Sequence, residues 1–264
     1  MGIDRRPAYV DTEVGRVHLV AAGPADGEPV FLLHQTPRSC DEYREVLGVL
    51  GRHRRCLALD TLGYGASAPP VEHTIEAYAA GVLAVAAALG VDRFDVVGHH
   101  TGGAVAVEVA ASAPAQVRRL VLSSTSYIDA AARAARQARP HALDAYTSQD
   151  DGSHLLTLWR GREPYYPAGH PRLRDRYLRD ALRADDPAAG HRAVAHYEME
   201  RRLPLVTAPT WCVVHEQDPH AMPSQPRLVE ALGAEVLPIP DGHVPLEYTA
   251  DAFAAALLPV LAAG

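Results

Sequence analysis

The chain has 264 residues, of which 48% are hydrophobic, and its formal net charge is −7. A chain of this length and apolar content can bury one substantial core, and its acidic balance argues against a nucleic-acid partner, whose phosphates need a basic face. The sequence contains no lysine and no asparagine, which excludes a Schiff-base lysine, a P-loop lysine and an asparagine oxyanion donor.

The sequence also carries signals of compartment. No apolar run reaches the ~18 residues that a membrane span needs, and Met1–Pro7 lacks the apolar stretch of a signal peptide. The three cysteines, Cys40, Cys56 and Cys212, are odd in number and widely spaced, which favours reduced core thiols over a disulfide framework. These observations predict a cytoplasmic protein that does not associate with a membrane.

Short apolar runs alternate along the chain with longer segments of helical period, a pattern typical of a mostly parallel sheet covered by helices on both faces. The sequence Ser39-Cys40-Asp41-Glu42 is a capping box that begins a helix ending at Gly51, and Thr74 caps a second helix that runs to Gly90. A third helix begins at Gly102. The apolar runs predict strands at 17–21, 30–33, 56–59, 94–97, 120–123, 210–214 and 236–239.

Residues 126–205 interrupt this alternation and are rich in arginine, tyrosine and helical patterns. They predict a helical cap inserted after the sixth strand, which leaves 1–125 and 206–264 as the two parts of one core domain. We expect the cap to cover a site at the edge of the sheet.

A sharp strand-to-helix turn is predicted at Val96-Val97-Gly98-His99-His100-Thr101-Gly102-Gly103. His100 stands where a G-x-S-x-G elbow presents a serine. Because the flanking glycines let strand and helix approach closely, the turn displays His100 beyond the carboxyl end of the strand, where ligands of parallel sheets bind. The backbone N–H of Thr101 lies in the first helical turn and can donate to an oxyanion.

Five segments resemble, in order and spacing, motifs of the α/β-hydrolase superfamily. The resemblance covers essentially the whole chain and implies a mostly parallel eight-stranded sheet with helices on both faces and a helical cap. The matching segments are Phe31-Leu32-Leu33-His34-Gln35-Thr36-Pro37, Asp60-Thr61-Leu62-Gly63-Tyr64-Gly65-Ala66-Ser67, the turn around His100, His215-Glu216-Gln217-Asp218 and Asp241-Gly242-His243.

Carried over by residue, the resemblance places His100 at the nucleophile position, Asp218 at the acid and His243 at the general base. It makes the N–H groups of Thr36 and Thr101 the oxyanion donors. The sequence departs from the family pattern in two places, since histidine replaces the expected serine, cysteine or aspartate nucleophile, and the glycine after the loop histidine is replaced by glutamine at position 35.

An imidazole at position 100 leaves three chemical routes open. It can attack a carbonyl and form an acyl-imidazole, which favours an activated ester or thioester because that intermediate is a high-energy acyl donor. His100 and His243 facing one cavity would titrate in coupled steps, leaving one acid and one base, with Asp218 hydrogen-bonded to His243 and His100 neutral. The pair can also activate water without a covalent intermediate.

The residues around the predicted site have structural interpretations as well. We expect His99 to pack in the core, and Asp60, His215 and Glu216 to order loops; His34 either orients the oxyanion loop or contacts substrate. Arg38 and Arg160 are candidate carboxylate clamps, although arginines of this kind are more often solvated. The candidate pocket residues are His34, Gln35, Arg38, Tyr127, Trp159, Tyr165, Tyr166 and Tyr197.

A metal site is a further alternative, because His100, His243 and a carboxylate have the composition of a two-histidine, one-carboxylate centre, with His34 or His220 as an extra ligand. No close-spaced pair such as H-E-x-x-H supports it. We therefore expect neither metal nor cofactor.

The sequence favours a cofactor-independent enzyme that hydrolyses an acyl (ester or thioester) or C–C bond of a small apolar or aromatic molecule. The alternative is a non-hydrolytic acid/base catalyst of secondary metabolism, acting as a lyase, decarboxylase, dehydratase or cyclase. The third is a non-catalytic ligand-binding protein, since a fold alone does not establish a function. The expected partner is a small-molecule substrate, and a homodimer is compatible with the sequence.

Overall fold

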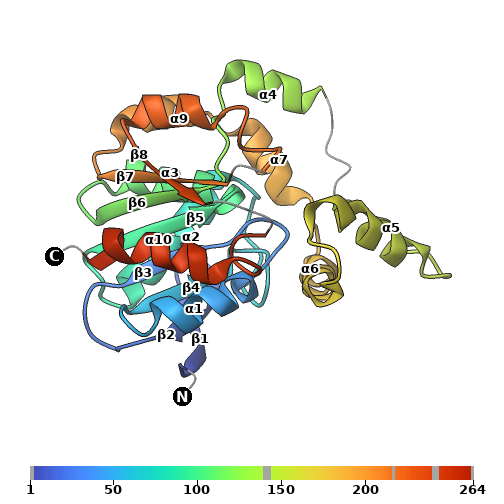
Figure 1. Ribbon diagram of the computed structural model, residues 1–264, viewed down its shortest axis with the longest axis horizontal. Helices are drawn as coiled ribbons and strands as arrows, with labels where there is room; N and C mark the ends of the chain where they lie inside the picture. The colour runs from blue at the N-terminus through green and yellow to red at the C-terminus, as the bar shows by residue number, and fades with distance from the viewer. Residues whose placement is uncertain (1–2, 139–143, 216–217, 240–243, 263–264) are drawn as a thin grey trace.

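The computed structural model describes residues 3–138, 144–215, 218–239 and 244–262. Its centre is an eight-stranded sheet in the order β1-β2-β4-β3-β5-β6-β7-β8 (Figure 1). The β1–β2 and β2–β4 pairs are antiparallel, and all other pairs are parallel. The strands are β1 Arg5–Thr12, β2 Gly15–Ala22, β3 Val30–Leu33, β4 Cys56–Leu59, β5 Phe94–His99, β6 Val117–Ser123, β7 Thr210–His215 and β8 Glu235–Ile239.

Two buried layers arise from the alternation of side chains along the central strands. In β3, Phe31 and Leu33 pack with α2 (Ile75–Ala88) and α3 (Thr101–Ser112) on one face. Val30 and Leu32 pack with α1 (Arg44–Leu50) and α10 (Ala250–Ala262) on the other. All four β3 residues are buried, as expected for a parallel strand covered on both faces. The predicted architecture is confirmed.

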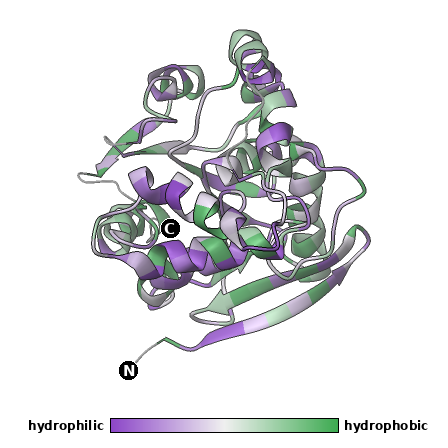
Figure 2. Ribbon diagram, turned by 90° about the vertical axis from the view of Figure 1, so that its right-hand side faces the viewer, coloured by the Kyte–Doolittle hydropathy of each residue, from purple (hydrophilic) through white to green (hydrophobic). Residues whose placement is uncertain are grey.

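The seven strands expected from apolar runs are all present, and β1 is the one that the pattern missed. Six of its eight residues are exposed, so its sequence contains no buried run to detect. Figure 2 shows hydrophilic colour over the first residues of this strand, next to the N-terminus. It joins the sheet through backbone pairing with β2 over a tight turn, in which Thr12 lies opposite Gly15.

Both side-chain caps predicted at helix starts are observed. The hydroxyl of Ser39 accepts a hydrogen bond from the Asp41 N–H at 3.3 Å, ahead of the 3₁₀ helix η1 (Cys40–Tyr43) that leads into α1. The hydroxyl of Thr74 accepts from the Ala77 N–H at 3.0 Å at the start of α2. The capping box itself is not formed, because the Glu42 carboxylate binds elsewhere, as described below.

The chain between β6 and β7 is helical, as the sequence predicts. Its helices gather beside the carboxyl ends of the parallel strands (Figure 1), and α7 and α8 pack against α3. The elements are α4 Ala130–Gln137, α5 Ser153–Arg162, η2 Glu163–Tyr165, α6 Pro171–Arg183, α7 Ala189–His196, α8 Met199–Arg202 and η3 Leu203–Leu205, followed after β7 by α9 Gln225–Leu232.

Two further expectations concern the whole chain. Cys40, Cys56 and Cys212 are free and buried, as reduced core thiols should be. Over the described residues, none of the helices combines the length and the apolarity that a membrane crossing requires.

Candidate active site

His100 lies at the apex of a sharp turn between β5 and α3. Its backbone has φ 47° and ψ −111°, a positive-φ conformation that costs a non-glycine residue of order 1–3 kcal/mol and clusters at functional sites. The turn is held by its N–H, which donates to the Ser123 carbonyl at 3.0 Å, and by its carbonyl, which accepts from the Gly103 N–H at 2.9 Å. The predicted elbow is therefore present, with an imidazole displayed from it.

Glycines make this turn sterically possible. A Cβ at Gly98 would lie 2.1 Å from the Gly102 carbonyl oxygen, and one at Gly102 would lie 2.1 Å from the Leu33 carbonyl oxygen. Both contacts would be with backbone oxygens, which cannot move without displacing the strand or the helix. The elbow therefore packs α3 directly against the ends of β3 and β5, which brings His100 to the carboxyl edge of the sheet.

His100 lies within hydrogen-bond distance of Asp218, because its Nε2 is 3.0 Å from Oδ2 of that carboxylate. Asp218 follows β7, and its Oδ1 accepts hydrogen bonds from the N–H groups of His220 at 2.8 Å and Ala221 at 3.1 Å. Burial alone would raise the pKa of Asp218, but the charge and hydrogen bond of His100 outweigh it and hold that pKa well below its usual value. A fixed carboxylate thus orients the imidazole.

The sequence expectation is a hydrogen bond between Asp218 and His243, and the contact with His100 was not part of it. In the structure the carboxylate contacts His100 directly. His243, together with Asp241, Gly242, Glu216 and Gln217, lies outside the described residues. The placement of His100 and His243 in one cavity therefore stays a prediction.

Two neutral histidines lie behind His100. His99 is buried as expected, its ring centroid is 4.5 Å from that of His100, and its Nδ1 is 2.9 Å from the Ser123 hydroxyl. The same hydroxyl lies 3.0 Å from Nε2 of His215. Burial, together with repulsion from His100, lowers the pKa of His215 to about 4 and that of His99 well below its usual value. Neither His99 nor His215 therefore carries a positive charge near neutral pH.

The two threonines that are predicted to supply the oxyanion donors are in side-chain contact. The Thr36 and Thr101 hydroxyls are 2.9 Å apart, and the N–H of Thr101 stands in the first turn of α3, where a helix has no internal acceptor for it. His34 stabilises the loops around it. Its Nδ1 lies 2.7 Å from the Gln35 carbonyl oxygen, and its Nε2 accepts a hydrogen bond from the Thr61 N–H at 3.0 Å. Both ring nitrogens are thereby used, which leaves none for a metal ion.

Gln35 is fixed in place by Glu42. The carboxylate of Glu42 accepts from the backbone N–H of Gln35 at 3.0 Å and from its side-chain amide at 2.6 Å. The carboxylate of Glu42 therefore binds the loop instead of completing the capping box with Ser39. The replacement of glycine at position 35 thus adds a hydrogen bond that holds the loop carrying Thr36.

A cavity of about 670 Å³ opens at His100, within the range of pockets for small organic ligands. Of the predicted pocket residues, Gln35, Arg38, Tyr165 and Tyr166 line it. His34, Tyr127, Trp159 and Tyr197 are not among the described lining residues. The lining also holds His99, Thr101, Ile128, Ala132, Ala135, Arg136, Arg162, Tyr177, His191, Val194, Asp218 and His220.

The residues that do not line the cavity have other partners. The ring of Tyr127 stacks under Arg227 and that of Trp159 under Arg174, and the Tyr197 hydroxyl donates to Glu108 at 3.0 Å. Cation–π contacts of this kind are general features of protein surfaces. Aromatic residues at helical spacing in the insertion therefore divide between the cavity wall and the packing of the insertion.

Arg38 is buried, whereas the sequence analysis favoured a solvated side chain at this position. Its side chain is 1% exposed and binds Glu247 at 2.9 and 3.0 Å and Asp180 at 2.8 Å. Asp180 comes from α6, and Glu247 follows the last strand, so the partners are far apart in sequence. Arg160, the second candidate clamp, is exposed on α5.

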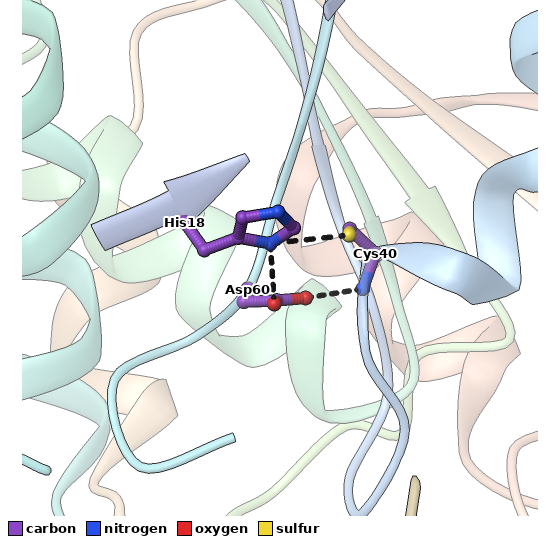
Figure 3. A group of neighbouring side chains, drawn as sticks. All are labelled: His18, Cys40 and Asp60. Atoms are coloured by element: carbon purple, nitrogen blue, oxygen red, sulfur yellow. Dashed lines mark hydrogen bonds and ion pairs between the residues drawn. The ribbon is translucent and has the colours of Figure 1, made fainter. Parts of the chain in front are cut away.

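His18, Cys40 and Asp60 form a second titratable cluster (Figure 3), and none of the three is among the described residues that line the cavity. His18 Nδ1 is 2.8 Å from Asp60 Oδ2 and 3.8 Å from the Cys40 sulfur, so one ring atom serves both partners. The carboxylate also accepts from the backbone N–H groups of Cys40 and Ala66 at 2.6 and 2.7 Å. Burial and the nearby Asp60 charge raise the pKa of Cys40 strongly.

This cluster fits a structural tie better than a metal centre. A metal ion needs a thiolate and free lone pairs, whereas Cys40 holds its proton and Asp60 already accepts three hydrogen bonds. The tie joins β2, η1 and the loop after β4. Asp60 thus orders loops, as the sequence predicts.

Comparison with known proteins gives a family match and several partial relatives. Residues 28–225 match the model of the alpha/beta hydrolase fold family. The 2-hydroxy-6-oxo-2,4-heptadienoate hydrolase of Pseudomonas putida is 35% identical over 126 residues, 43% of this chain and 45% of that protein. Haloalkane dehalogenase 2 of Mycobacterium tuberculosis is 33% identical over 119 residues, 44% and 41% of the two chains. The matched segments thus span less than half of these relatives.

Similarity in structure extends over the whole chain. An enol-lactonase from Burkholderia xenovorans has a TM-score of 0.78 at 19% identity, covering 97% of this chain and 100% of that one. A hydrolase from Pseudomonas aeruginosa has a TM-score of 0.80 at 22% identity, covering 98% and 99%. At these identities the similarity concerns the fold.

Proposed function

Because the chain belongs to the alpha/beta hydrolase fold family, we propose that it is an enzyme that hydrolyses an acyl bond of a small organic molecule, with His100 as the catalytic base. The observation that carries this proposal is the 3.0 Å contact between His100 Nε2 and Asp218 Oδ2, formed at the elbow and inside the cavity. A second support is the nature of the named relatives, a hydrolase, a dehalogenase and an enol-lactonase.

The contact selects which ring nitrogen reacts. When Nε2–H donates to Asp218, the lone pair resides on Nδ1, which becomes the base. The carboxylate stabilises the imidazolium that forms when the proton arrives, as an aspartate does in a catalytic triad. Because His99 and His215 are neutral, neither of these two neighbouring rings opposes this charge.

The proposed reaction then proceeds in two steps. Nδ1 of His100 takes a proton from water while the water oxygen attacks the carbonyl carbon, and the negative charge formed on the carbonyl oxygen is stabilised by the N–H groups of Thr36 and Thr101. The tetrahedral species collapses, the C–O or C–S bond breaks, and the proton passes to the departing alkoxide or thiolate. His243 stays in the proposal as a second proton carrier, on the family resemblance alone.

A covalent route and a non-hydrolytic route remain as alternatives that the same residues allow. Nδ1 could attack the carbonyl itself and give an acyl-imidazole. Since the displayed residue of the elbow, His100, carries no hydroxyl or thiol, the pair could also remove an acidic C–H or O–H proton and catalyse elimination, decarboxylation or ring closure. A binding protein without catalysis would need neither an oriented base nor oxyanion donors.

Hydrolysis of p-nitrophenyl butyrate and of an acyl thioester tests the proposal. We expect His100→Ala to lower kcat/KM by about 10²–10⁴-fold, the usual contribution of a positioned base. His53→Ala, which removes an exposed histidine, should change it less than twofold. Unchanged hydrolysis in the His100 variant, or no hydrolysis of any such substrate by the wild-type protein, would overturn the proposal.

Mass spectrometry of acid-quenched protein separates the base from the nucleophile. General-base catalysis predicts turnover without an acyl adduct on His100, whereas the covalent route predicts a mass increase equal to the acyl group. Accumulation of that adduct during turnover would replace the first mechanism by the second.

A further inference from the structure

The wall of the cavity is basic, although the protein as a whole is acidic. Among the described residues that line it, three are arginines, four are histidines and one, Asp218, is a carboxylate. The net charge of the whole chain is −7. His99 is neutral, and burial also lowers the pKa of His220. The positive charge of this wall is therefore assigned to its arginines, and it favours an anionic ligand. The basic lining residues are Arg38, Arg136, Arg162, His99, His100, His191 and His220.

Two of the three arginines are already neutralised. Arg38 is held by Glu247 and Asp180. Arg162 donates from Nε to Asp144 Oδ1 at 3.0 Å, and its NH2 group pairs with the other oxygen of that carboxylate. Since the guanidinium groups of both residues have carboxylates within hydrogen-bond distance, neither needs a ligand to balance its charge.

Arg136 differs from both. It lies in the last turn of α4, which presents Ala132, Ala135 and Arg136 to the cavity, the spacing of one helical face. Arg133, on the same helix, does not line the cavity and pairs with Glu200. Within the described part of the chain, no carboxylate lies within ion-pair distance of Arg136, and burial lowers the pKa of its guanidinium.

A partly buried guanidinium without a carboxylate loses hydration and gains nothing in exchange. A planar carboxylate would restore the balance through two parallel N–H···O bonds. The neighbouring residues on the helix, Ala132 and Ala135, are small and leave space against this wall. The apolar side chains of Ile128 and Val194 line the same cavity and suit a hydrocarbon linker.

We propose that Arg136 binds a carboxylate of the substrate, so that the protein acts on acyl compounds that carry a free acid group remote from the reacting carbonyl. The position of that carbonyl at His100 rests on the proposed function; the carboxylate subsite does not. Arg136 is then the residue that determines specificity for anionic over neutral substrates.

A pair of substrates that differ in one charge tests this. Mono-p-nitrophenyl glutarate carries a free carboxylate, and its methyl ester does not. We expect Arg136→Gln to raise KM for the acid by about 10- to 100-fold, the effect of losing a charge-assisted hydrogen-bonded pair. The kcat/KM for the methyl ester should change less than twofold, and Arg136→Lys should recover part of the loss.

Arg160→Gln is the matched control, because it removes the same charge from an exposed position of α5 outside the described cavity lining. It should leave both substrates within twofold of wild type. Equal effects of Arg136→Gln on the two substrates, no effect on either, or an equal effect of Arg160→Gln would overturn the inference.

Binding of glutarate itself, measured by calorimetry on a His100→Ala background, needs no turnover. We expect the added Arg136→Gln change to weaken binding at least about tenfold. If glutarate binds in this Arg136-dependent way while no ester is hydrolysed, the subsite stands and the proposed function fails. If esters are hydrolysed while Arg136→Gln leaves the affinity for glutarate unchanged, the proposed function stands and the subsite fails.

Discussion

At the scale of single residues, the strained backbone at His100 and the carboxylate beside it belong together. A positive φ at a histidine persists only where the surroundings impose it, and here Ser123, Gly103 and Asp218 all bond to this residue. The imidazole is 24% exposed and its carboxylate 8%. A partly accessible ring oriented by a buried anion is the arrangement that a base requires.

His215 predicts a loss of stability in mild acid. Its pKa of about 4 in the folded protein lies below the ~6.5 of an unfolded chain, so the unfolded state takes up the proton first. The stability is fully present above pH 6.5 and falls by up to roughly 3 kcal/mol as the pH falls to 4. His99 adds to it in the same direction.

Thermal unfolding at pH 7.5 and pH 5.0 measures this effect. We expect the decrease in Tm between these values to be smaller in His215→Gln than in wild type, whatever the absolute Tm of the variant. His53→Gln, at an exposed site, should show the wild-type decrease. Equal decreases in all three proteins would mean that His215 is not the group that titrates.

At the scale of elements, the sequence predicted those features that depend on interactions between residues close together in the chain, such as helix caps and buried strands. Ser39 and Thr74 begin their helices because a side-chain oxygen at that position accepts a free N–H of the first turn. The central strands were visible because both of their faces are buried. β1 was missed because it is held in the sheet by backbone hydrogen bonds to β2. Its side chains show no pattern from which this pairing can be predicted.

Two glycine substitutions, one at the elbow and one inside α1, should have opposite effects on stability. Gly102→Ala would push a methyl group into the Leu33 carbonyl at the end of β3, and we expect it to destabilise the protein by roughly 1–3 kcal/mol, the usual cost of overpacking. Gly48→Ala, inside α1 with open space around it, should stabilise by roughly 0.5–1 kcal/mol. Urea unfolding reports both values. A neutral Gly102→Ala would show that strand and helix are not in tight contact.

At the scale of the whole molecule, ion pairs tie α6, one of the helices between β6 and β7, to the segment that follows β3. Arg38 from the loop after β3 binds Asp180 on α6, and Arg176 on α6 binds Asp41 at 2.7 Å and Glu45 at 2.9 Å. Glu247 lies within reach of both arginines. The sequence could not predict this network, because its partners come from three segments that are far apart in the chain, and only folding brings these segments together.

The candidate site also combines features that the sequence predicted with features that only the folded chain reveals. The place of His100 on a turn, the neighbouring Thr36 and Thr101, and the course of β7 to Asp218 follow from motifs with local geometry. The direct contact of His100 with Asp218 was not expected, because it depends on how far the loop after β7 reaches across the sheet edge. Arg136 was missed for a related reason, since nothing in the sequence of α4 indicates which of its arginines faces a cavity.

The central claim is that His100 and Asp218 act as one catalytic unit, and a double-mutant cycle on kcat/KM for p-nitrophenyl butyrate tests it most directly. We expect His100→Gln and Asp218→Asn each to lose about 10²–10⁴-fold, and the double variant to lose little more than His100→Gln alone, because groups that act as a unit are not additive. Losses that multiply in the double variant, or wild-type activity in either single variant, would contradict the account.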